Sequence, residues 1–392
     1  MDIVHFSDTH LGFREFNRVD PETGINQREQ DVYDAFTSLV DRVLTIDPDL
    51  VLHAGDLFDN VRPNNRAVNL AAEQFSRLSE AGIPTVLIAG NHDTPKISTT
   101  GTITRALDRL SHIEAVTSDP GSNDSGYRKI PVGGTMIHAL SDEPTEEKLS
   151  ERIKDLKPEE SYNWNVLVLH AGIRTLEGRV FSGEFNEHHV DKDLIENRGF
   201  DYVALGHYHK RMEVDLSSTT KAVYCGAPER FSFNESAYEP GFVRVYLKEN
   251  EVSYVEELIE TREFITLNTI EGEDLSVREI QDEIKSRLPE DKDINGSLLS
   301  LKITGIDDNS YSLLEERLLD DLRDRAFETS YKVVGPSELE RDASLLRFSD
   351  LRTEFSDFMK NRAELSDDLD SAKLIETGQK YLGIALGDED ED

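Results

Sequence analysis

The chain has 392 residues, with 43 lysines and arginines against 79 aspartates and glutamates, and its net charge is −36. This length predicts two or three domains, and the single cysteine, Cys225, excludes an internal disulfide and a thiolate metal cluster. The charge fits a protein that binds cations or basic partners, a disordered chain, or a halophilic protein. Apolar periodicity argues against disorder, and the even spread of acids with few lysines favours the halophilic interpretation.

Residues 1–265 alternate short apolar runs with amphipathic stretches. Residues 28–46 and 64–82 have helical patterns, and the buried strands of a parallel or mixed sheet are predicted at IVHF, LVLHA, TVLIA, VLVLH and YVAL. This alternation predicts a layered α/β domain. The N-terminal residues 1–7 read as a strand and no apolar run approaches about 18 residues, so we expect a cytoplasmic protein without a signal peptide or membrane span.

Two further regions follow this domain. Residues 266–340 predict a small α/β module, with helices near 275–288 and 310–325 that precede the strands LLSLKITG and SYKVV. Residues 341–392 have only helical patterning and end in the acidic run GDEDED. The apolar stripe of this last region could fold back onto the core, but its charged faces and its distance from the first domain favour a groove on a partner protein.

Metal-capable side chains follow five of the predicted strands. Because ligands of open α/β sheets bind beyond the carboxyl ends of the strands, these side chains should meet at one edge. One metal-capable residue at a strand end can arise by chance, whereas five such strand ends indicate a metal-binding site. The candidate ligands are Asp8, His10, Asp56, Asn91, His170, His207 and His209.

The ligand types indicate the chemistry. Carboxylates, imidazoles and one amide suit Mn²⁺, Fe or Zn²⁺, and seven ligands fit two metals that share one carboxylate. Two metals about 3.5–4 Å apart clamp the attacking and leaving oxygens of a phosphoryl displacement. His92 follows Asn91, so its side chain should point elsewhere. It could protonate the leaving oxygen or stabilise charge on the phosphate, or it could give structural support only.

The motifs D-x-H, G-D, G-N-H-D, H and G-H-x-H occur in an order that resembles the calcineurin-like metallophosphoesterase superfamily. Four longer segments resemble its double-strand-break repair branch, the SbcD-type and meiotic-recombination nucleases: SDTHLGFREFN, QREQDVYDAF, GDLFDNVRP and VYCGAPERFSFNE. The resemblance covers residues 1–240 well and the later regions only in layout. It implies a layered two-sheet domain with helices outside. Together with the acidic composition, it predicts a protein from a halophilic archaeon.

The resemblance also assigns roles. Asp56 would bridge two Mn²⁺ ions per subunit, with Mg, Fe and Zn as alternatives; Asp8, His10 and His209 would complete one site, and Asn91, His170 and His207 the other. The implied activities are 3′–5′ exonuclease action on duplex DNA and endonuclease action on single strands or hairpins. Residues 1–265 would be the nuclease domain, 266–340 a DNA-capping domain, and 341–392 the segment that binds a coiled-coil ABC-type ATPase. Relatives form homodimers through the stretch that corresponds to helices near 64–82 and 97–110.

One position departs from the pattern. Many relatives carry histidine three positions after the bridging aspartate to position substrate phosphate, and this chain has Asp59 there. Asp59, Arg14 and Arg62 are candidate contacts to the phosphate, with surface ion pairing as the alternative for the arginines; His53 is interpreted as a core histidine. Two other functions stay open. The extra module argues against a protein or nucleotide phosphatase, and the complete ligand set argues against a scaffold that binds DNA without cleaving it.

Overall fold

The computed structural model describes residues 1–95, 97, 100–118, 126–174, 188–217, 219–249, 251–288, 294–306, 322 and 325–334. The chain divides into two compact units, the first formed by Met1–Thr266 with Gly296–Leu298 and the second by the remaining residues. The segment 341–392 and nearly all of the helix expected at 310–325 lie outside the described residues.

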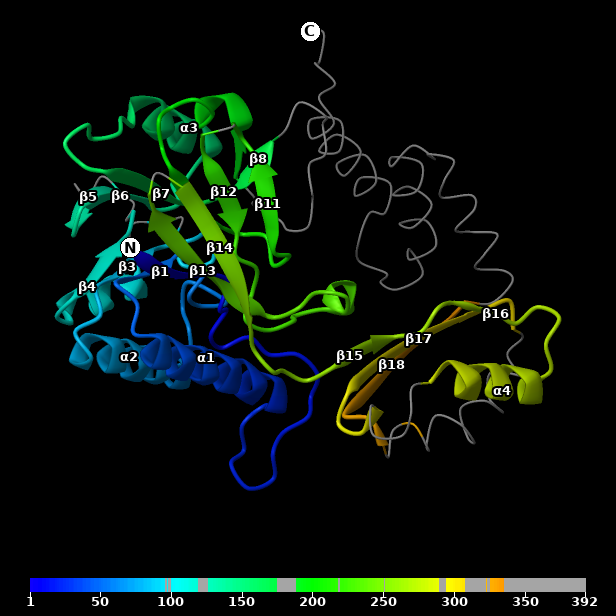
Figure 1. The fold of residues 1–392 in the computed structure, drawn as a ribbon. Helices are drawn as coiled ribbons and strands as arrows, with labels where there is room; N and C mark the ends of the chain where they lie inside the picture. The colour runs from blue at the N-terminus through cyan, green and yellow to red at the C-terminus, as the bar shows by residue number, and fades with distance from the viewer. Residues whose placement is uncertain are drawn as a thin grey trace, which may run out of the picture. The chain divides into compact units, whose positions relative to one another are not determined.

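The first unit contains a six-stranded sheet that holds the N-terminal strand near its middle. The strands β1 to β4 are parallel, β13 pairs antiparallel with β1, and β14 pairs antiparallel with β13 at the edge of the sheet. Helices α1 (Gln27–Ile46) and α2 (Asn65–Glu80) cover one face of this sheet (Figure 1). Their apolar side chains belong to the core cluster on that face. The sheet order is β14 (Glu251–Leu258), β13 (Gly241–Lys248), β1 (Asp2–Phe6), β2 (Leu50–His53), β3 (Thr85–Ile88) and β4 (Ile113–Val116).

A second six-stranded sheet packs face to face on the first through a shared apolar core that includes Ile3, Leu52, Ile137 and Val168. Helix α3 (Glu146–Asp155) covers the outer face of this sheet. The expected layered two-sheet fold with helices outside is therefore confirmed for this unit. The sheet order is β11 (Met212–Asp215), β12 (Lys221–Tyr224), β10 (Tyr202–Gly206), β7 (Trp164–His170), β6 (Thr135–Leu140) and β5 (Tyr127–Val132).

Local capping explains where the two long helices begin. Asn26 accepts hydrogen bonds from two backbone N–H groups of α1 (Gln27–Ile46), and Asn64 does the same for α2 (Asn65–Glu80). The helix expected near 97–110 is instead a 3₁₀ helix, η1 (Ile103–Arg109). Gly101 has a left-handed φ of 67° and Thr102 is extended without a side-chain cap, so a helix cannot run through them.

Short elements complete the first unit: the paired strands β8 (Gly172–Arg174) and β9 (His189–Asp191), the 3₁₀ helices η2 (Lys192–Leu194) and η3 (Phe233–Glu235), and β15 (Phe264–Thr266) at its end. In the second unit, β16 (Ile270–Glu271) and β18 (Glu328–Val334) both pair with β17 (Leu298–Thr304), which belongs to this unit from Leu299 onward. Helix α4 (Val277–Arg287) begins with a capping box between Ser276 and Glu279. Among the helices of the described ranges, none is long and apolar enough to cross a membrane.

Candidate metal centre

The structure brings the metal-capable side chains from all five strand ends together. On one side, the Nε2 atoms of His10 and His209 are 3.1 Å apart. Asp8 joins these two histidines in a group whose ligand atoms all lie within 4.8 Å of one another. Two ligands of one ion with bonds of about 2.1 Å lie about 3.0–3.4 Å apart, so this spacing is compatible with ligation of a shared ion.

The other side is built around His170. Its Nε2 lies 3.0 Å from Oδ1 of Asn91 and 3.2 Å from Oδ2 of Asp56. The same Asp56 oxygen is 3.9 Å from Nε2 of His10, so Asp56 stands between the two groups. The backbone N–H of His207 donates to the Asp8 carboxylate, and the His207 ring packs edge-on against His170 with centroids 5.3 Å apart.

Backbone conformations at this edge are costly. Four of the seven residues have left-handed φ values without being glycine: Asp8 at 53°, His10 at 42°, Asp56 at 56° and His207 at 104°. Such outliers cost about 1–3 kcal/mol each and persist where the surrounding structure enforces them, commonly at functional sites. The sequence therefore holds these side chains in place at the expense of local stability.

Two glycines of the motifs are required by close approach. A Cβ on Gly90 would lie 2.2 Å from Oδ1 of Asp56, and a Cβ on Gly206 would lie 2.0 Å from the carbonyl oxygen of Ala54. Neither glycine has positive φ, so the missing side chain itself is what the site needs. These contacts explain why glycine precedes Asn91 and His207.

Burial sets the electrostatics of the centre. It raises the pKa of Asp8 and holds the pKa of His10 well below its usual range. Burial also opposes charge on His170 and Asp56, but their mutual attraction dominates and raises the pKa of His170 to about 10 while it lowers that of Asp56. Carboxylates removed from water need a compensating positive charge. The donor set and its spacing therefore fit divalent metal ions.

His92 lies beside these residues with its ring held in place. Its backbone N–H donates to Oδ1 of Asp56 over 2.9 Å, and its Nδ1 is 2.6 Å from the carbonyl oxygen of Asp59. The ring contacts that of His10, with centroids 4.7 Å apart. The Asp59 carboxylate approaches His10, with Oδ1 3.9 Å from Nδ1, so both His92 and Asp59 border the centre.

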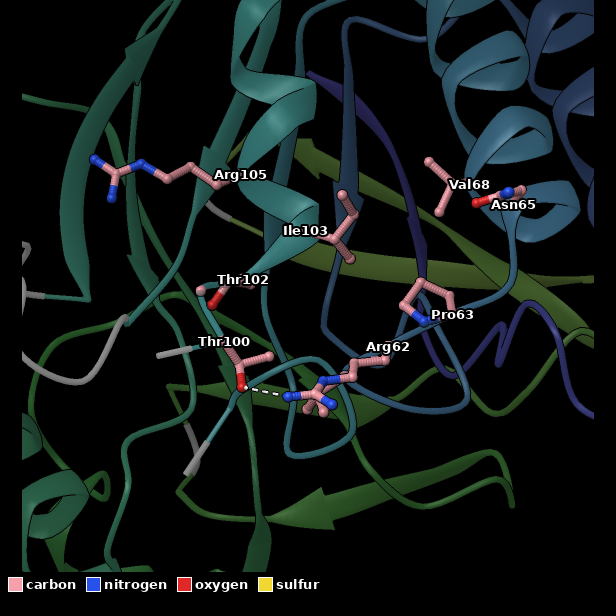
Figure 2. A pocket seen from close by; sticks show the side chains of 10 residues that line it. Arg62, Pro63, Asn65, Val68, Thr100, Thr102, Ile103 and Arg105 are labelled. Carbon is pink, nitrogen blue, oxygen red and sulfur yellow. Dashed lines mark hydrogen bonds between the residues drawn. The ribbon is translucent and has the colours of Figure 1, made fainter. Parts of the chain in front are cut away.

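The candidate arginines have partners in the protein. Nε of Arg14 is 2.9 Å from the buried carboxylate of Glu29. Arg62 donates to Oγ1 of Thr100 over 3.3 Å, and it lines a surface pocket of about 660 Å³ with Ile103 and Arg105 (Figure 2). His53 is fully buried in the core, as its position before the strand end suggests.

Sequence reasoning missed two carboxylates that support the centre. Asp93 accepts hydrogen bonds from the backbone N–H groups of Leu57, Phe58 and Gly90, and burial raises its pKa to about 7. Glu235 places Oε1 3.0 Å from Nδ1 of His209. Both lie inside segments of the recognised motifs, but neither position follows a strand.

Two stacked sheets with candidate metal ligands gathered at one edge are typical of metal-dependent phosphoesterases. In agreement, the family model described as calcineurin-like phosphoesterase matches residues 1–211. Within this class, the chain belongs to the Mre11 family of DNA double-strand break repair proteins, because it is 31% identical to that protein of Methanocaldococcus jannaschii over 278 residues, 68% of this chain and 69% of the relative. The family resemblance expected from the motifs is thereby confirmed.

Two further relatives carry the same description. Mre11 of Sulfurisphaera tokodaii is 35% identical over 229 residues, which are 58% of this chain and 54% of the relative. Mre11 of Methanococcus maripaludis is 26% identical over 368 residues, 92% of this chain and 91% of the relative. The chain thus spans about half the length of the first relative and most of the last.

Proposed function

We propose that the chain is a two-metal DNA nuclease of double-strand-break repair that hydrolyses phosphodiester bonds. The observation that carries this proposal is the meeting of carboxylate and imidazole groups from five strand ends in a member of a break-repair family. Asp56 would bridge the metals. The other ligands would be Asp8, His10 and His209 at one metal, and Asn91, His170 and His207 at the other.

Bound divalent metals would activate water and neutralise charge on the phosphate. Mixed oxygen and nitrogen donors suit Mn²⁺, with Mg, Fe and Zn as alternatives that a titration distinguishes. His92 would then donate a proton to the leaving oxygen, because the carbonyl oxygen of Asp59 fixes its ring beside His10. Asp59 would border the phosphate in place of the usual histidine, with Arg14 and Arg62 as outer contacts.

The same proposal covers the rest of the chain. Residues 266–340 would cap DNA, and residues 341–392 would bind a coiled-coil ABC-type ATPase in the cytoplasm, close to the nucleoid. The region around α2 and η1 would form the homodimer interface. The motif resemblance implies these roles, together with 3′–5′ exonuclease action on duplex DNA and endonuclease action on single strands or hairpins. Similarity to DNA double-strand break repair proteins is consistent with a role in break repair.

A paired assay separates this function from its alternatives. We would incubate the full chain and Mn²⁺ with a labelled DNA hairpin and, in parallel, with p-nitrophenyl phosphate. We expect hairpin cleavage to disappear in Asp56→Asn and to persist in Asp215→Asn. Asp215 is exposed, so the second variant controls for the change from carboxylate to carboxamide. Hydrolysis of p-nitrophenyl phosphate alone would favour a phosphatase, and DNA binding without hydrolysis would favour a scaffold.

A further inference from the structure

The loop that contains η3 supports one wall of the candidate metal centre. Glu235 accepts from two directions: Oε1 is 3.0 Å from Nδ1 of His209, and Oε2 accepts the backbone N–H of Phe231 over 2.6 Å. A carboxylate that accepts from Nδ1 fixes the proton on that nitrogen, so the Nε2 lone pair of His209 faces His10. The tautomer needed for metal ligation is thereby selected.

The ring of Phe231 holds the same two histidines from the side. Its centroid lies 4.9 Å from that of His10 and 5.0 Å from that of His209. Phe13 backs this ring at 5.0 Å. Because Glu235 fixes the Phe231 backbone, one carboxylate determines both the orientation of His209 and the packing beside it.

This loop is also attached to the segment that leaves the first unit. Phe233 packs edge-on against Phe264 with centroids 5.3 Å apart, and Oγ of Ser236 lies 3.2 Å from Oγ1 of Thr266. The segment itself is anchored, since Arg262 donates twice to the Asp31 carboxylate over 2.7 Å. The buried guanidinium of Arg28 lies over the Phe264 ring at 5.1 Å.

We propose that Glu235 is a positioning residue for His209, and that the Phe233–Phe264 contact makes metal affinity depend on the segment joining the two units. This rests on the proposed function only in taking His209 as a metal ligand. Loss of a carboxylate behind a ligating histidine typically lowers metal affinity about 10–100-fold. If the role of Glu235 were purely structural, its replacement would instead lower thermal stability and leave the metal affinity unchanged.

The first experiment is calorimetric titration of the metal-free full chain with Mn²⁺. Glu235→Gln keeps the shape but removes the charge, and we expect its dissociation constant to rise about 10–100-fold. Glu235→Asp should recover part of the affinity. Glu239→Gln is the matched control, since Glu239 is exposed four residues further on, and it should bind as the parent does. Equal affinity of the parent and Glu235→Gln would overturn the proposal, and so would an Asp variant that binds no better than Gln.

The second experiment tests the joining segment. Phe264→Ala should weaken Mn²⁺ binding more than Phe200→Ala, which removes an equally buried ring that packs on His138 in the second sheet. Equal metal affinity in these two variants would refute the dependence on the segment. Both titrations are independent of DNA cleavage. If the parent binds Mn²⁺ and Glu235→Gln binds it poorly while neither cleaves DNA, the proposed nuclease function fails and the positioning role stands.

Discussion

Replacing Gly90 by alanine should damage the metal centre without any change to a ligand. The new Cβ would lie 2.2 Å from Oδ1 and 2.5 Å from the backbone N of Asp56, whereas ordinary contacts begin at 3.4 Å. The Asp56 carboxylate must therefore move by about 1 Å, far beyond the tolerance of about 0.2 Å for a metal bond. Overpacking of this kind costs about 1–3 kcal/mol, which would lower the melting temperature by about 2–12 °C.

The assay is Mn²⁺ titration of the purified variant, followed by a thermal melt without metal. We expect the dissociation constant for Mn²⁺ to rise more than about tenfold. Displacing the Asp56 carboxylate need weaken the binding free energy by only about 1.4 kcal/mol to have that effect. Gly134→Ala is the control, since its Cβ would meet only the Asn163 side-chain nitrogen at 3.3 Å. If Gly90→Ala binds Mn²⁺ with the parent's stoichiometry and affinity, Asp56 does not bridge metals in the arrangement described.

The remaining predictions concern catalysis, pH, salt and partner binding. His92→Ser should keep both metals and cleave DNA about 10²–10⁴-fold more slowly in single-turnover assays; near-normal cleavage would remove its assigned role. Burial lowers the pKa of His53 to about 3 in the folded protein. Between about pH 6.5 and pH 3 this imidazole therefore binds a proton only in the unfolded state, so the free energy of unfolding should fall toward pH 4. Melting temperatures of His53→Gln should fall less over that range; equal slopes would contradict this. The net charge of −36 should make melting temperature rise from 0.1 to about 3 M KCl, and a flat or falling series would exclude a halophilic protein. Deletion of 341–392 should abolish co-purification with the ATPase and spare Mn²⁺-dependent cleavage; retained association would place that surface elsewhere.

The strand ends were predictable because their signal is local. A buried strand reads as an apolar run, and the residue after it is known from the sequence alone, which identifies positions such as Asp56 and His170. The structure then brings them within 3.2 Å of each other. The parallel order of β1 to β4 follows from the alternation of strands and helices.

Contacts made by irregular segments were not predictable in the same way. Glu235 reaches His209 across 26 residues from a 3₁₀ turn, and no periodicity marks such a position. The Asp93 carboxylate accepts hydrogen bonds from the backbone N–H groups of residues 57, 58 and 90. These donors come together only when β2 and β3 pair. The expected helix before Arg109 shortened because Gly101 interrupts it, and helical patterning alone does not show this.

The proposed function requires that this chain hydrolyse DNA phosphodiesters with metals held by the five strand ends. The most direct test is an anaerobic, metal-free preparation of the full chain, to which Mn²⁺ is added back in the presence of an end-labelled DNA hairpin. We predict that cleavage appears only with metal, saturates near two Mn²⁺ per chain, and is absent in Asp56→Asn. Cleavage without added metal, or equal cleavage by Asp56→Asn, would contradict it.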